Sequence, residues 1–591
     1  MNSGGALDWL ARCDLPRAWG GKTCWAILDA DFGDARAFVQ CWQAWRLDHQ
    51  RPRILHYVGI AAHSPSATDL ANWAGIGDQD AALWQALAAQ CADRGTGFHR
   101  ILLDEGRVSL TLCIGDVRAV LKEHIFLADT VRATTDGDPW VVQGLARRCK
   151  RGARFYLYPS PAANAAAESP LRVLLEQAGF AWDASTPVEA TAGSPPITGQ
   201  FNPPWEIPTR RSPLRHANPT PAHCAVIGAG ISGASVAHAL ALRGWKVTVL
   251  DQAPTPARAA SGLPVGLASA HVSADDSPLS RLSRSGVRLA IGHAQQLLSN
   301  GQDWELSGVL ERKPGATAQW QQHAAWIKPS ALVSAWLDHP NITFVGLTPV
   351  DTLHRVEGLW HLGSQQTAGL GGFEQVVIAN AMGCKALLRQ AMQSAQEIPW
   401  DVDLPAKLST LQALHGTLSH GVYAEDIDGL PSTPVNGNGG FFPHVPSPHG
   451  MQWASGSTFE TDALAAADLG TQHATNMLRL RQLLPEFGDT LVQVLERGPV
   501  HLWSSTRCVT HDRLPLVGAV DAKAANGLWV SVGMGARGLG FAPLCAQLLV
   551  ARMGGEPLPV EWSLARSLDV CRTRRTRTST PNTKQPDDQT F

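Results

Sequence analysis

The chain of 591 residues is long enough for three or four compact domains of ordinary size. Apolar residues make up 44% of it and charged residues 17%, a balance that is typical of a folded protein with a large core and excludes a disordered chain. The formal net charge of −2 excludes a protein that binds nucleic acid through its overall positive charge, while a local basic face stays compatible with it.

The 11 cysteines include no CxxC pair, which favours reduced thiols over disulfides or a zinc site, and we expect no metal. The N-terminal residues MNSGGALDWLARCDLPRAW show no apolar segment behind a basic start, so we expect no secretory signal. No apolar run reaches about 18 residues, the length of a membrane span. The expectation is a cytoplasmic protein without a membrane segment.

Residues 1–183 alternate short apolar runs with helical patterns, and we predict one α/β domain with a parallel sheet. The expected strands are 23–30, 53–61, 108–116 and 154–159, and the clearest helices are 82–94 and 171–180. Residues 184–222 are rich in proline, which fixes φ and removes a donor. We interpret them as a linker, or a strap over the domains, that cannot form a sheet or a long helix.

A second α/β unit is expected over 223–568, followed by a polar, disordered tail over 569–591. Its first strand runs into Gly228-Ala-Gly230-Ile-Ser-Gly233, then a helix and a second strand that ends at Asp251. In this dinucleotide-binding fingerprint, Gly228 permits a tight turn, Gly230 lets the backbone approach a pyrophosphate, and Gly233 allows close helix packing. The carboxylate of Asp251, 18 residues after Gly233, is placed to accept both ribose hydroxyls.

Two further segments favour FAD over NAD as the ligand of this fingerprint. The segment 257–270 resembles the small-residue stretch that wraps the flavin in amino-acid-oxidase-like flavoenzymes, and we place Ala260, Ser261, Gly262 and Gly266 at the cofactor. The segment 528–550 resembles the late glycine turn that closes the flavin site in the same family, through Gly533, Gly535, Gly538 and Gly540. We therefore predict an FAD-binding Rossmann-type domain with an inserted α+β substrate domain.

Motifs along the whole chain resemble the family of bifunctional tRNA 5-methylaminomethyl-2-thiouridine biosynthesis proteins (MnmC type). The motifs that carry the resemblance are LPRAWGGKTCWAILDADFG (15–33), HRILLDEGRVSLTLCIGD (99–116), LARRCKRGARF (145–155), AAWIKPSALVSAWL (324–337), STRCVTHDRLPLVG (505–518) and GMGARGLGFAPLCA (533–546).

The resemblance implies a Rossmann-like methyltransferase domain, the linker, and the FAD-dependent oxidoreductase, with tRNA as the partner. The FAD half would remove the carboxymethyl group from 5-carboxymethylaminomethyl-(2-thio)uridine at the tRNA wobble position. The other half would methylate the resulting amine from S-adenosylmethionine.

Oxidation of an N-substituted glycine needs a cation for its carboxylate, and the planar fork of arginine binds both oxygens. Arg507 and Arg537 are the first candidates, because each lies in a segment expected to border the flavin. His511 and Arg513 are the second pair of candidates. The alternative roles are a structural salt bridge for Arg507 and a loop-closing hydrogen bond for Arg537.

The methyltransferase half departs from the family at three contacts. Gly33 remains in the turn after the first strand, but Asp31 and Ala35 replace glycines there, and a Cβ blocks close approach or resists φ > 0. At the second contact, Ala61 stands at the end of the second strand, where the resemblance implies an acidic residue that binds the ribose of S-adenosylmethionine.

At the third contact, Asp129 in the segment 126–132 matches the catalytic acid only with one inserted residue. Asp116 is retained on the adenine side. We hypothesise that this half keeps the fold but binds S-adenosylmethionine poorly or not at all; the alternative is a divergent, active methyltransferase.

Two rival interpretations of the whole chain remain at this point. A protein that binds a ligand but catalyses no reaction would need a broken flavin site, but the glycines of that site are intact in this sequence. A small-molecule oxidase of D-amino-acid or sarcosine type shares the flavin elements but leaves the N-terminal half unexplained. Contact with tRNA phosphates is suggested by basic clusters at 147–151, 210–215 and 572–577.

Overall fold

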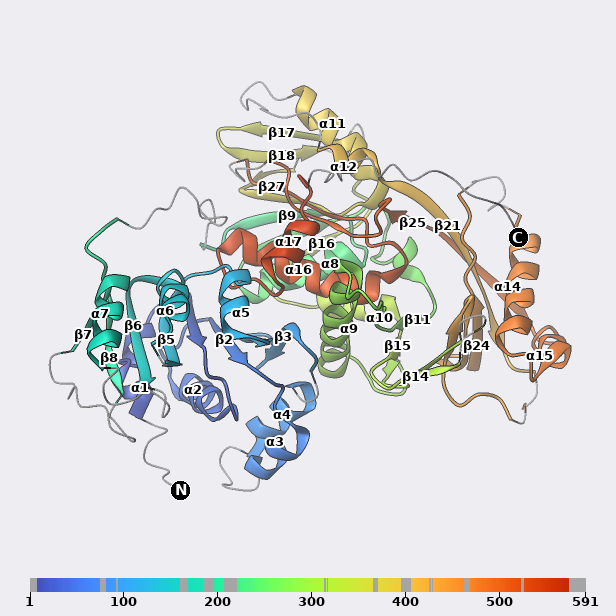
Figure 1. Ribbon diagram of the computed structural model, residues 1–591. Helices are drawn as coiled ribbons and strands as arrows, with labels where there is room; N and C mark the ends of the chain where they lie inside the picture. The colour runs from blue at the N-terminus through green and yellow to red at the C-terminus, as the bar shows by residue number, and fades with distance from the viewer. Residues whose placement is uncertain are drawn as a thin grey trace, which may run out of the picture.

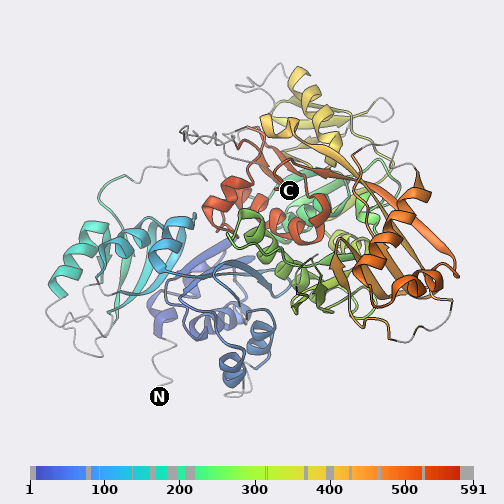
Figure 2. The ribbon, with the colours of Figure 1, turned by 45° about the vertical axis from the view of Figure 1, so that its right-hand side comes forward.

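The computed structural model describes residues 8–74, 81–91, 94–135, 137–159, 168–183, 196–206, 220–312, 315, 317–364, 370–394, 405–424, 427, 429–461, 468–521 and 526–572. Within these residues an N-terminal α/β unit lies beside a larger C-terminal unit (Figure 1). The same arrangement is visible after a turn of 45° (Figure 2), with an antiparallel sheet and its two helices at the side of the molecule away from the N-terminal unit.

The N-terminal unit is built on one sheet whose central strands are parallel, as the alternation of strands and helices predicts. Its order is β3-β4-β2-β1-β5-β6-β8-β7, with antiparallel pairs at both edges. The strands are β1 (Cys24–Asp29), β2 (Ile54–Ala61), β3 (Gly97–Leu103), β4 (Val108–Ile114), β5 (Ala128–Thr135), β6 (Cys149–Pro159), β7 (Phe180–Trp182) and β8 (Ile197–Phe201).

Alternating residues of these strands supply two cores, one on each face of the sheet. Ile27 packs with α2 and α4, whereas its neighbours Ala26 and Leu28 pack with α5, α6 and α7. The helices are α1 (Asp8–Arg12), α2 (Arg36–Leu47), α3 (Ala67–Ala74), α4 (Ala81–Cys91), α5 (Val117–Glu123), α6 (Pro139–Ala146) and α7 (Glu168–Ala178).

The expectation that residues 184–222 contain no strand is wrong for β8. This strand lies between β6 and β7 and pairs antiparallel with both. Its five residues stand between Pro196 and Pro203, so no proline interrupts the hydrogen bonds. Gly199 at its centre faces the backbone of Ala181 so closely that a side chain would clash. The rest of the described part of that segment carries no regular element, and residues 184–195 and 207–219 lie outside the described residues.

The C-terminal unit contains a second, mostly parallel sheet in the order β16-β10-β9-β20-β27-β26. The chain moves from β9 to β10 and β16 on one side, and later returns to β20 and β27 on the other. The sheet therefore has a switch point between β9 and β20, where ligands of such sheets bind. The strands are β9 (His223–Ile227), β10 (Lys246–Leu250), β16 (Ile342–Val345), β20 (Gln375–Ile378), β26 (Leu516–Ala519) and β27 (Leu528–Val532).

Three helices, α8 (Ile231–Leu242), α9 (Pro278–Leu297) and α16 (Gly538–Gly554), pack on this sheet and contact one another through small residues. The small side chains of α8 let α16 approach, and Ser235 Oγ donates a hydrogen bond to the carbonyl oxygen of Ala542 (3.2 Å). Helix α9 crosses α16 where Gly286 meets the backbone of Gly540, and a Cβ there would clash. This packing brings segments about 300 residues apart in sequence into one layer.

Two insertions between the strands of this sheet form a mostly antiparallel seven-stranded sheet, which is covered by helices α14 (Leu469–Leu483) and α15 (Gly488–Leu495). Smaller elements are β11 (Gly266–Ala268), β12 (Trp304–Glu305), β15 (Ala325–Ile327), α10 (Pro329–Leu337), β17 (Thr352–Val356), β18 (Leu359–Gly363), β19 (Leu370–Phe373), α11 (Cys384–Ser394), α12 (Ala406–Ser409) and α17 (Trp562–Ser567). The sheet itself consists of β13 (Val309–Glu311), β14 (Gln319–Gln321), β21 (Gln412–Val422), β22 (Val435–Gly437), β23 (Gly439–Ser447), β24 (Gly450–Gly456) and β25 (Val500–Val509).

The two units are joined by a buried interface along β3. Ser285 Oγ donates to the carbonyl oxygen of Phe98 (2.9 Å), and Gln296 Nε2 donates to that of Leu102 (2.9 Å). The side chain of Leu102 is part of the core formed by α8 and α16. These contacts make the N-terminal unit a packed support of the C-terminal unit, not a loosely tethered domain.

A buried ion pair between Arg243 and Glu556 lies at this interface. Arg243 donates to both carboxylate oxygens (2.6 and 2.7 Å), and Arg100 reaches the same loop through the carbonyl oxygen of Pro557. His56 lies 3.6 Å from Glu556, but burial lowers its pKa to about 3, so it is neutral. Burial opposes ionisation of Glu556, yet the charge of Arg243 outweighs it and lowers the pKa of this carboxyl.

We expect Glu556→Gln to lower the free energy of unfolding by about 3–5 kcal/mol, because it leaves Arg243 buried without a counter-charge. A carboxyl with a lowered pKa contributes stability above its unfolded pKa, and that contribution is lost as the pH falls through the folded pKa. The free energy of unfolding of the variant should therefore fall less steeply than that of the wild type as the pH is lowered. Denaturant unfolding from pH 7 downward tests this. Glu105→Gln, which removes an exposed pair with Arg107, is the control and should change little.

No helix among the described residues combines the length and apolar character that crossing a bilayer requires.

Candidate functional site

A large cavity opens at the switch point of the second sheet. Its volume is about 1530 Å³, more than an ordinary small-molecule site of roughly 300–1000 Å³. The first glycine turn, the 260s segment and the late glycine turn all line it. Two segments that the sequence separates by about 300 residues therefore border one cavity, as the FAD prediction requires.

The first turn has the geometry expected from its three glycines. Gly228 adopts φ +105°, and a Cβ there would come within 2.9 Å of the carbonyl oxygen of Ala379, at the end of β20. Gly230 is the N-cap of α8 and faces the cavity. A Cβ at Gly233 would clash with the carbonyl oxygen of Gly228, so this glycine serves helix packing and does not line the cavity.

Asp251 lies at the end of β10 and lines the cavity. Its Oδ2 accepts from the amide of Ala229 (2.7 Å) and its Oδ1 from that of Ala253 (2.8 Å), which fixes the carboxylate at the first turn. Each carboxylate oxygen has a second lone pair, so acceptor capacity remains for ribose hydroxyls.

The segment after β10 packs against the start of α8. Ala260–Gly262 forms a short 3-10 helix, and Ser261 Oγ accepts from the amide of Ile231 (2.8 Å). Ala260, Ser261 and Gly266 line the cavity, whereas Gly262 lies behind them against the backbone of Ala257. Ser261 thereby holds the wrapping segment to the amides that would face a diphosphate.

The late turn meets the first turn directly. Gly533 and Gly535 adopt φ +78° and +59°, conformations that favour glycine. A Cβ at Gly538 would lie 3.2 Å from the side chain of Ile231 at the start of α8, and one at Gly540 2.9 Å from Val287. All four late glycines line the cavity.

The cavity and its glycine cradle fit FAD. At its wall the tight packing of Gly228 on Ala379 and of Gly540 on Val287 leaves no room for a side chain, and Gly230, Ile231 and Ser232 at the start of α8 line it. Asn380 Oδ1 is buried at the same wall without a hydrogen-bond partner among the described residues. The residues that would hold the cofactor are Gly228, Gly230, Asp251, Ala260, Ser261, Gly266, Gly533, Gly535, Gly538 and Gly540.

Arg507 of β25 lines the cavity on the side of the antiparallel sheet. Its guanidinium donates to Ser457 Oγ and to the carbonyl oxygen of Thr458 (3.3 Å), and it lies 5.0 Å from the ring centroid of Phe459. Among the described residues no carboxylate pairs with it, and burial lowers its pKa. The structural salt bridge considered as its alternative role is absent from this part of the chain.

Arg537, the N-cap of α16, and Arg513 line the same cavity. Burial and then the charge of Arg513 lower the pKa of Arg537, while Glu311 opposes them. His511 also borders the cavity, but its side chain is exposed. The four candidates thus border one cavity, and neighbouring oxygens hold Arg507 in a fixed orientation.

Sequence reasoning missed Ser457, Thr458 and Phe459, which hold and flank Arg507. They follow β24 in a segment without a recognisable motif, and only the pairing of β21 with both β24 and β25 brings them to Arg507. Contacts of this kind depend on sheet order, which the sequence pattern does not give.

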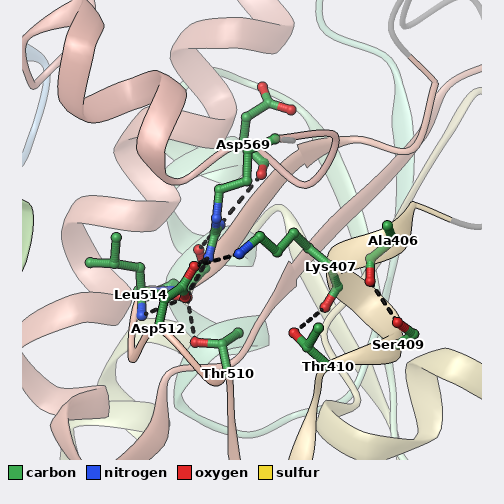
Figure 3. Close-up of polar contacts among 10 residues, drawn as sticks. Ala406, Lys407, Ser409, Thr410, Thr510, Asp512, Leu514 and Asp569 are labelled. Carbon is green, nitrogen blue, oxygen red and sulfur yellow. Dashed lines mark hydrogen bonds and ion pairs between the residues drawn. The ribbon is translucent and has the colours of Figure 1, made fainter. Parts of the chain in front are cut away.

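The loop that carries His511 and Arg513 is anchored by Asp512 (Figure 3). Lys407 Nζ donates to Asp512 Oδ2 (2.9 Å), and Arg572 Nη2 donates to both of its oxygens (2.9 and 3.1 Å). Burial opposes ionisation of Asp512, but hydrogen bonds from Lys407 and Arg572 outweigh it and lower its pKa to about 2. Arg572 therefore has a structural role at this loop, and its contact with tRNA stays a prediction.

We expect Asp512→Asn to loosen this loop without loss of FAD, because the glycine cradle does not depend on it. Amide hydrogen exchange over 510–514 should accelerate at neutral pH. Since the lowered pKa keeps the carboxylate ionised down to about pH 2, the wild-type loop should stay protected on mild acidification. An unchanged rate of amide exchange in the variant would show that the ion pairs of Asp512 do not anchor this loop.

Asp129 does not lie where its expected catalytic role requires. It stands near the start of β5, beside the amide of Ala26 in the middle of β1, and both its oxygens accept from Lys150 (2.8 Å). The carboxyl ends of β1 and β5 lie at the opposite edge of the sheet. Residues 128–132 of this segment belong to β5 and do not form a loop at the site, so this assignment is corrected.

Gly33 and Asp116 do lie at the carboxyl edge of the N-terminal sheet. Gly33 adopts φ +50° in the turn after β1. Asp116 follows β4 and caps α5 by accepting from the amide of Ala119 (2.9 Å). Both keep the positions expected from the resemblance, with the side chain of Asp116 engaged in the cap.

The basic cluster at 147–151 is mostly structural. Arg148 donates to the carbonyl oxygen of Leu121, and Arg151 clamps the chain after β8 through Asn202, Pro203 and Trp205. Lys150 binds Asp129, so Arg147 is the exposed member of this cluster whose side chain has no partner among the described residues. The clusters at 210–215 and 574–577 lie outside the described residues.

Comparison with known proteins gives a consistent result. Residues 223–339 and 290–552 match the family model "FAD dependent oxidoreductase". The chain is 41% identical over 593 residues to the tRNA 5-methylaminomethyl-2-thiouridine biosynthesis bifunctional protein MnmC of Albidiferax ferrireducens, covering 96% of each chain. It is 37% identical to the protein of the same name from Polaromonas naphthalenivorans, over 95% of this chain and 92% of that one. A glycine oxidase structure from Geobacillus kaustophilus, 17% identical, covers 60% of this chain and 100% of its own with a TM-score of 0.47.

Proposed function

This chain belongs to the family of bifunctional tRNA 5-methylaminomethyl-2-thiouridine biosynthesis proteins, and from that premise we propose that its C-terminal half removes the carboxymethyl group from the wobble uridine of tRNA. The protein is an FAD-dependent oxidoreductase of tRNA modification. The proposed substrate is 5-carboxymethylaminomethyl-(2-thio)uridine and the proposed product is its aminomethyl form. The site of action is the cytoplasm, where tRNA is modified.

The substrate side chain is a secondary amine, an N-substituted glycine. Bound FAD supplies a two-electron acceptor for the hydride on the glycine α-carbon. The substrate then carries a C=N bond, and water adds to it and releases glyoxylate and the primary amine. The task of the protein is to hold the glycine carboxylate, orient the C–H bond and keep the site in one geometry.

Arg507 carries this proposal, because it is a half-buried cation at the cavity without a carboxylate partner among the described residues. Burying an unpaired charge is costly, and an anionic substrate group removes that cost. Ser457 and Thr458 hold the guanidinium, and Phe459 covers one side of it. Its planar fork can then bind the glycine carboxylate with two hydrogen bonds. Arg537 adds positive potential from the late turn.

Incubation of the purified protein with carboxymethylaminomethyl-bearing tRNA, followed by nucleoside mass analysis, tests the function. The expected result is loss of the carboxymethyl nucleoside, with equal amounts of aminomethyl nucleoside and glyoxylate. Sarcosine and D-amino acids, tested in parallel, should be turned over far more slowly. Fast oxidation of these small molecules together with inert tRNA would replace the proposal by a small-molecule oxidase.

A further inference from the structure

The N-terminal sheet has its own switch point, between β1 and β5. From β1 the chain moves to β2 and β4 on one side and then returns to β5 on the other. A ligand of such a sheet binds in the crevice outside the carboxyl ends of the strands at this point. S-adenosylmethionine, which the family name implies, would have to lie there.

Side chains of this chain bridge that crevice. Arg132 of β5 donates to Asp29 Oδ1 at the end of β1 (2.8 Å) and to the carbonyl oxygen of Asp31 (2.7 Å). Thr134, also of β5, donates to Asp31 Oδ2 (2.6 Å). Three hydrogen bonds thus tie the turn after β1 to the end of β5 across the place where a ligand would enter.

The acid at the end of β1 accepts three hydrogen bonds in this network. Asp29 is completely buried, its Oδ2 accepts from Tyr57 (2.6 Å), and its Oδ1 accepts from the amide of Asp31 (3.1 Å) as well as from Arg132. Burial opposes protonation of Arg132, but the charge of Asp29 outweighs it and raises the pKa of the guanidinium. An ammonium group of a ligand would have to compete with this ion pair.

The start of α2 already holds an anion. Asp34 Oδ1 accepts from the amide of Arg36 at the first turn (3.2 Å), in the position where a ligand carboxylate would face the helix amides. Ala35 sits at φ +66° with its methyl group buried in the core, a conformation that only glycine adopts without strain. A methyl group therefore occupies the position at which the family's glycine would allow close approach of a ligand.

The end of β2 offers no carboxylate for a ribose. Ala61 is buried there, and the described residues that follow it directly, 62–66, contain no carboxylate. The residues present thus do not fit S-adenosylmethionine at its amino-acid end or at its ribose.

We infer that the N-terminal half does not bind S-adenosylmethionine, so that this chain releases tRNA with a primary aminomethyl group and a separate N-methyltransferase must consume that product. The inference rests on the proposed function for its product, but not for its binding claim. In the missing step the amine lone pair attacks the methyl carbon of a sulfonium donor, the C–S bond breaks with its electrons to sulfur, and the nitrogen loses one proton.

Calorimetric titration of S-adenosylmethionine into the full-length, FAD-loaded protein tests the binding claim. We expect no saturable heat up to millimolar ligand and no rise of Tm, with a methyltransferase of known affinity as positive control. Saturable binding with a micromolar Kd would overturn the inference, whatever the oxidase does.

The reaction claim is tested by supplying tRNA that already bears the aminomethyl group, so that the result does not depend on the oxidase. With S-adenosylmethionine present, the aminomethyl nucleoside should persist unchanged in mass analysis. Appearance of its methylated form would overturn the inference and leave the oxidase proposal standing. Carboxymethyl-bearing tRNA that stays intact in a parallel reaction would instead overturn the proposed function alone.

Discussion

Replacement of Gly230 by valine is expected to give a folded protein without FAD. Gly230 caps α8 at the cavity, and a Cβ there meets only Ser261 Oγ at 3.2 Å, so a side chain requires a shift of that hydroxyl by a few tenths of an ångström. A diphosphate held at the amides of α8 would not tolerate this side chain. Loss of two charge-assisted hydrogen bonds of about 1.5–3 kcal/mol each weakens FAD binding by roughly 100-fold or more.

Visible absorbance per mole of purified protein measures this loss, and circular dichroism verifies that the fold is retained. Gly95→Val is the matched control, because no atom lies within 4 Å of a Cβ there and the site is remote from the cavity. It should keep its full FAD content. A yellow Gly230 variant with wild-type flavin content would show that the first turn does not hold the cofactor.

Replacement of Arg507 by methionine is expected to lower kcat/KM for carboxymethyl-bearing tRNA by roughly 100- to 1000-fold with unchanged FAD content. Truncating one partner of a buried, hydrogen-bonded charge pair costs about 2–5 kcal/mol, and the substrate carboxylate is the partner here. The loss should fall on turnover of the carboxymethyl substrate, measured by glyoxylate release. Arg507→Lys should keep a small part of the activity, because it retains the charge without the fork.

Stability separates this role from a structural one. Arg507 has no carboxylate partner among the described residues, so its removal should leave Tm unchanged or raise it. Arg481→Met, which breaks an exposed pair with Asp489, is the control and should change neither activity nor Tm. A marked fall in Tm of the Arg507 variant, with full activity in the remaining folded protein, would assign this arginine to the fold.

The flavin half could be predicted from the sequence because its signals are local. The strand, turn, helix and acid around Gly228 and Asp251 follow one another within about thirty residues, and the late turn repeats such a pattern. Their meeting at one cavity is a consequence of parallel strand order, which places carboxyl ends at one edge. The residues that hold Arg507 have no such signal, because their contacts arise only from pairing of distant antiparallel strands.

The errors in the N-terminal half have physical causes of the same kind. Asp129 matches the catalytic acid only through the resemblance, with one inserted residue, and that match does not show that residues 128–135 form β5. Arg132 and Thr134 are the residues of this strand that contact the turn after β1 at the carboxyl end. β8 was hidden by the prolines on both sides of five strand-forming residues. His99 and Arg100 likewise obscure β3, since burial of these polar side chains follows from the interface with the C-terminal unit.

The most direct test of the account is anaerobic mixing of the purified full-length protein with tRNA that bears the carboxymethylaminomethyl group, followed in the visible spectrum. We predict a yellow protein whose flavin absorption is bleached by this tRNA and is left unchanged by tRNA that already carries the aminomethyl group. A folded protein that is colourless and takes up no FAD, or a yellow one that neither tRNA bleaches, would contradict the central claim.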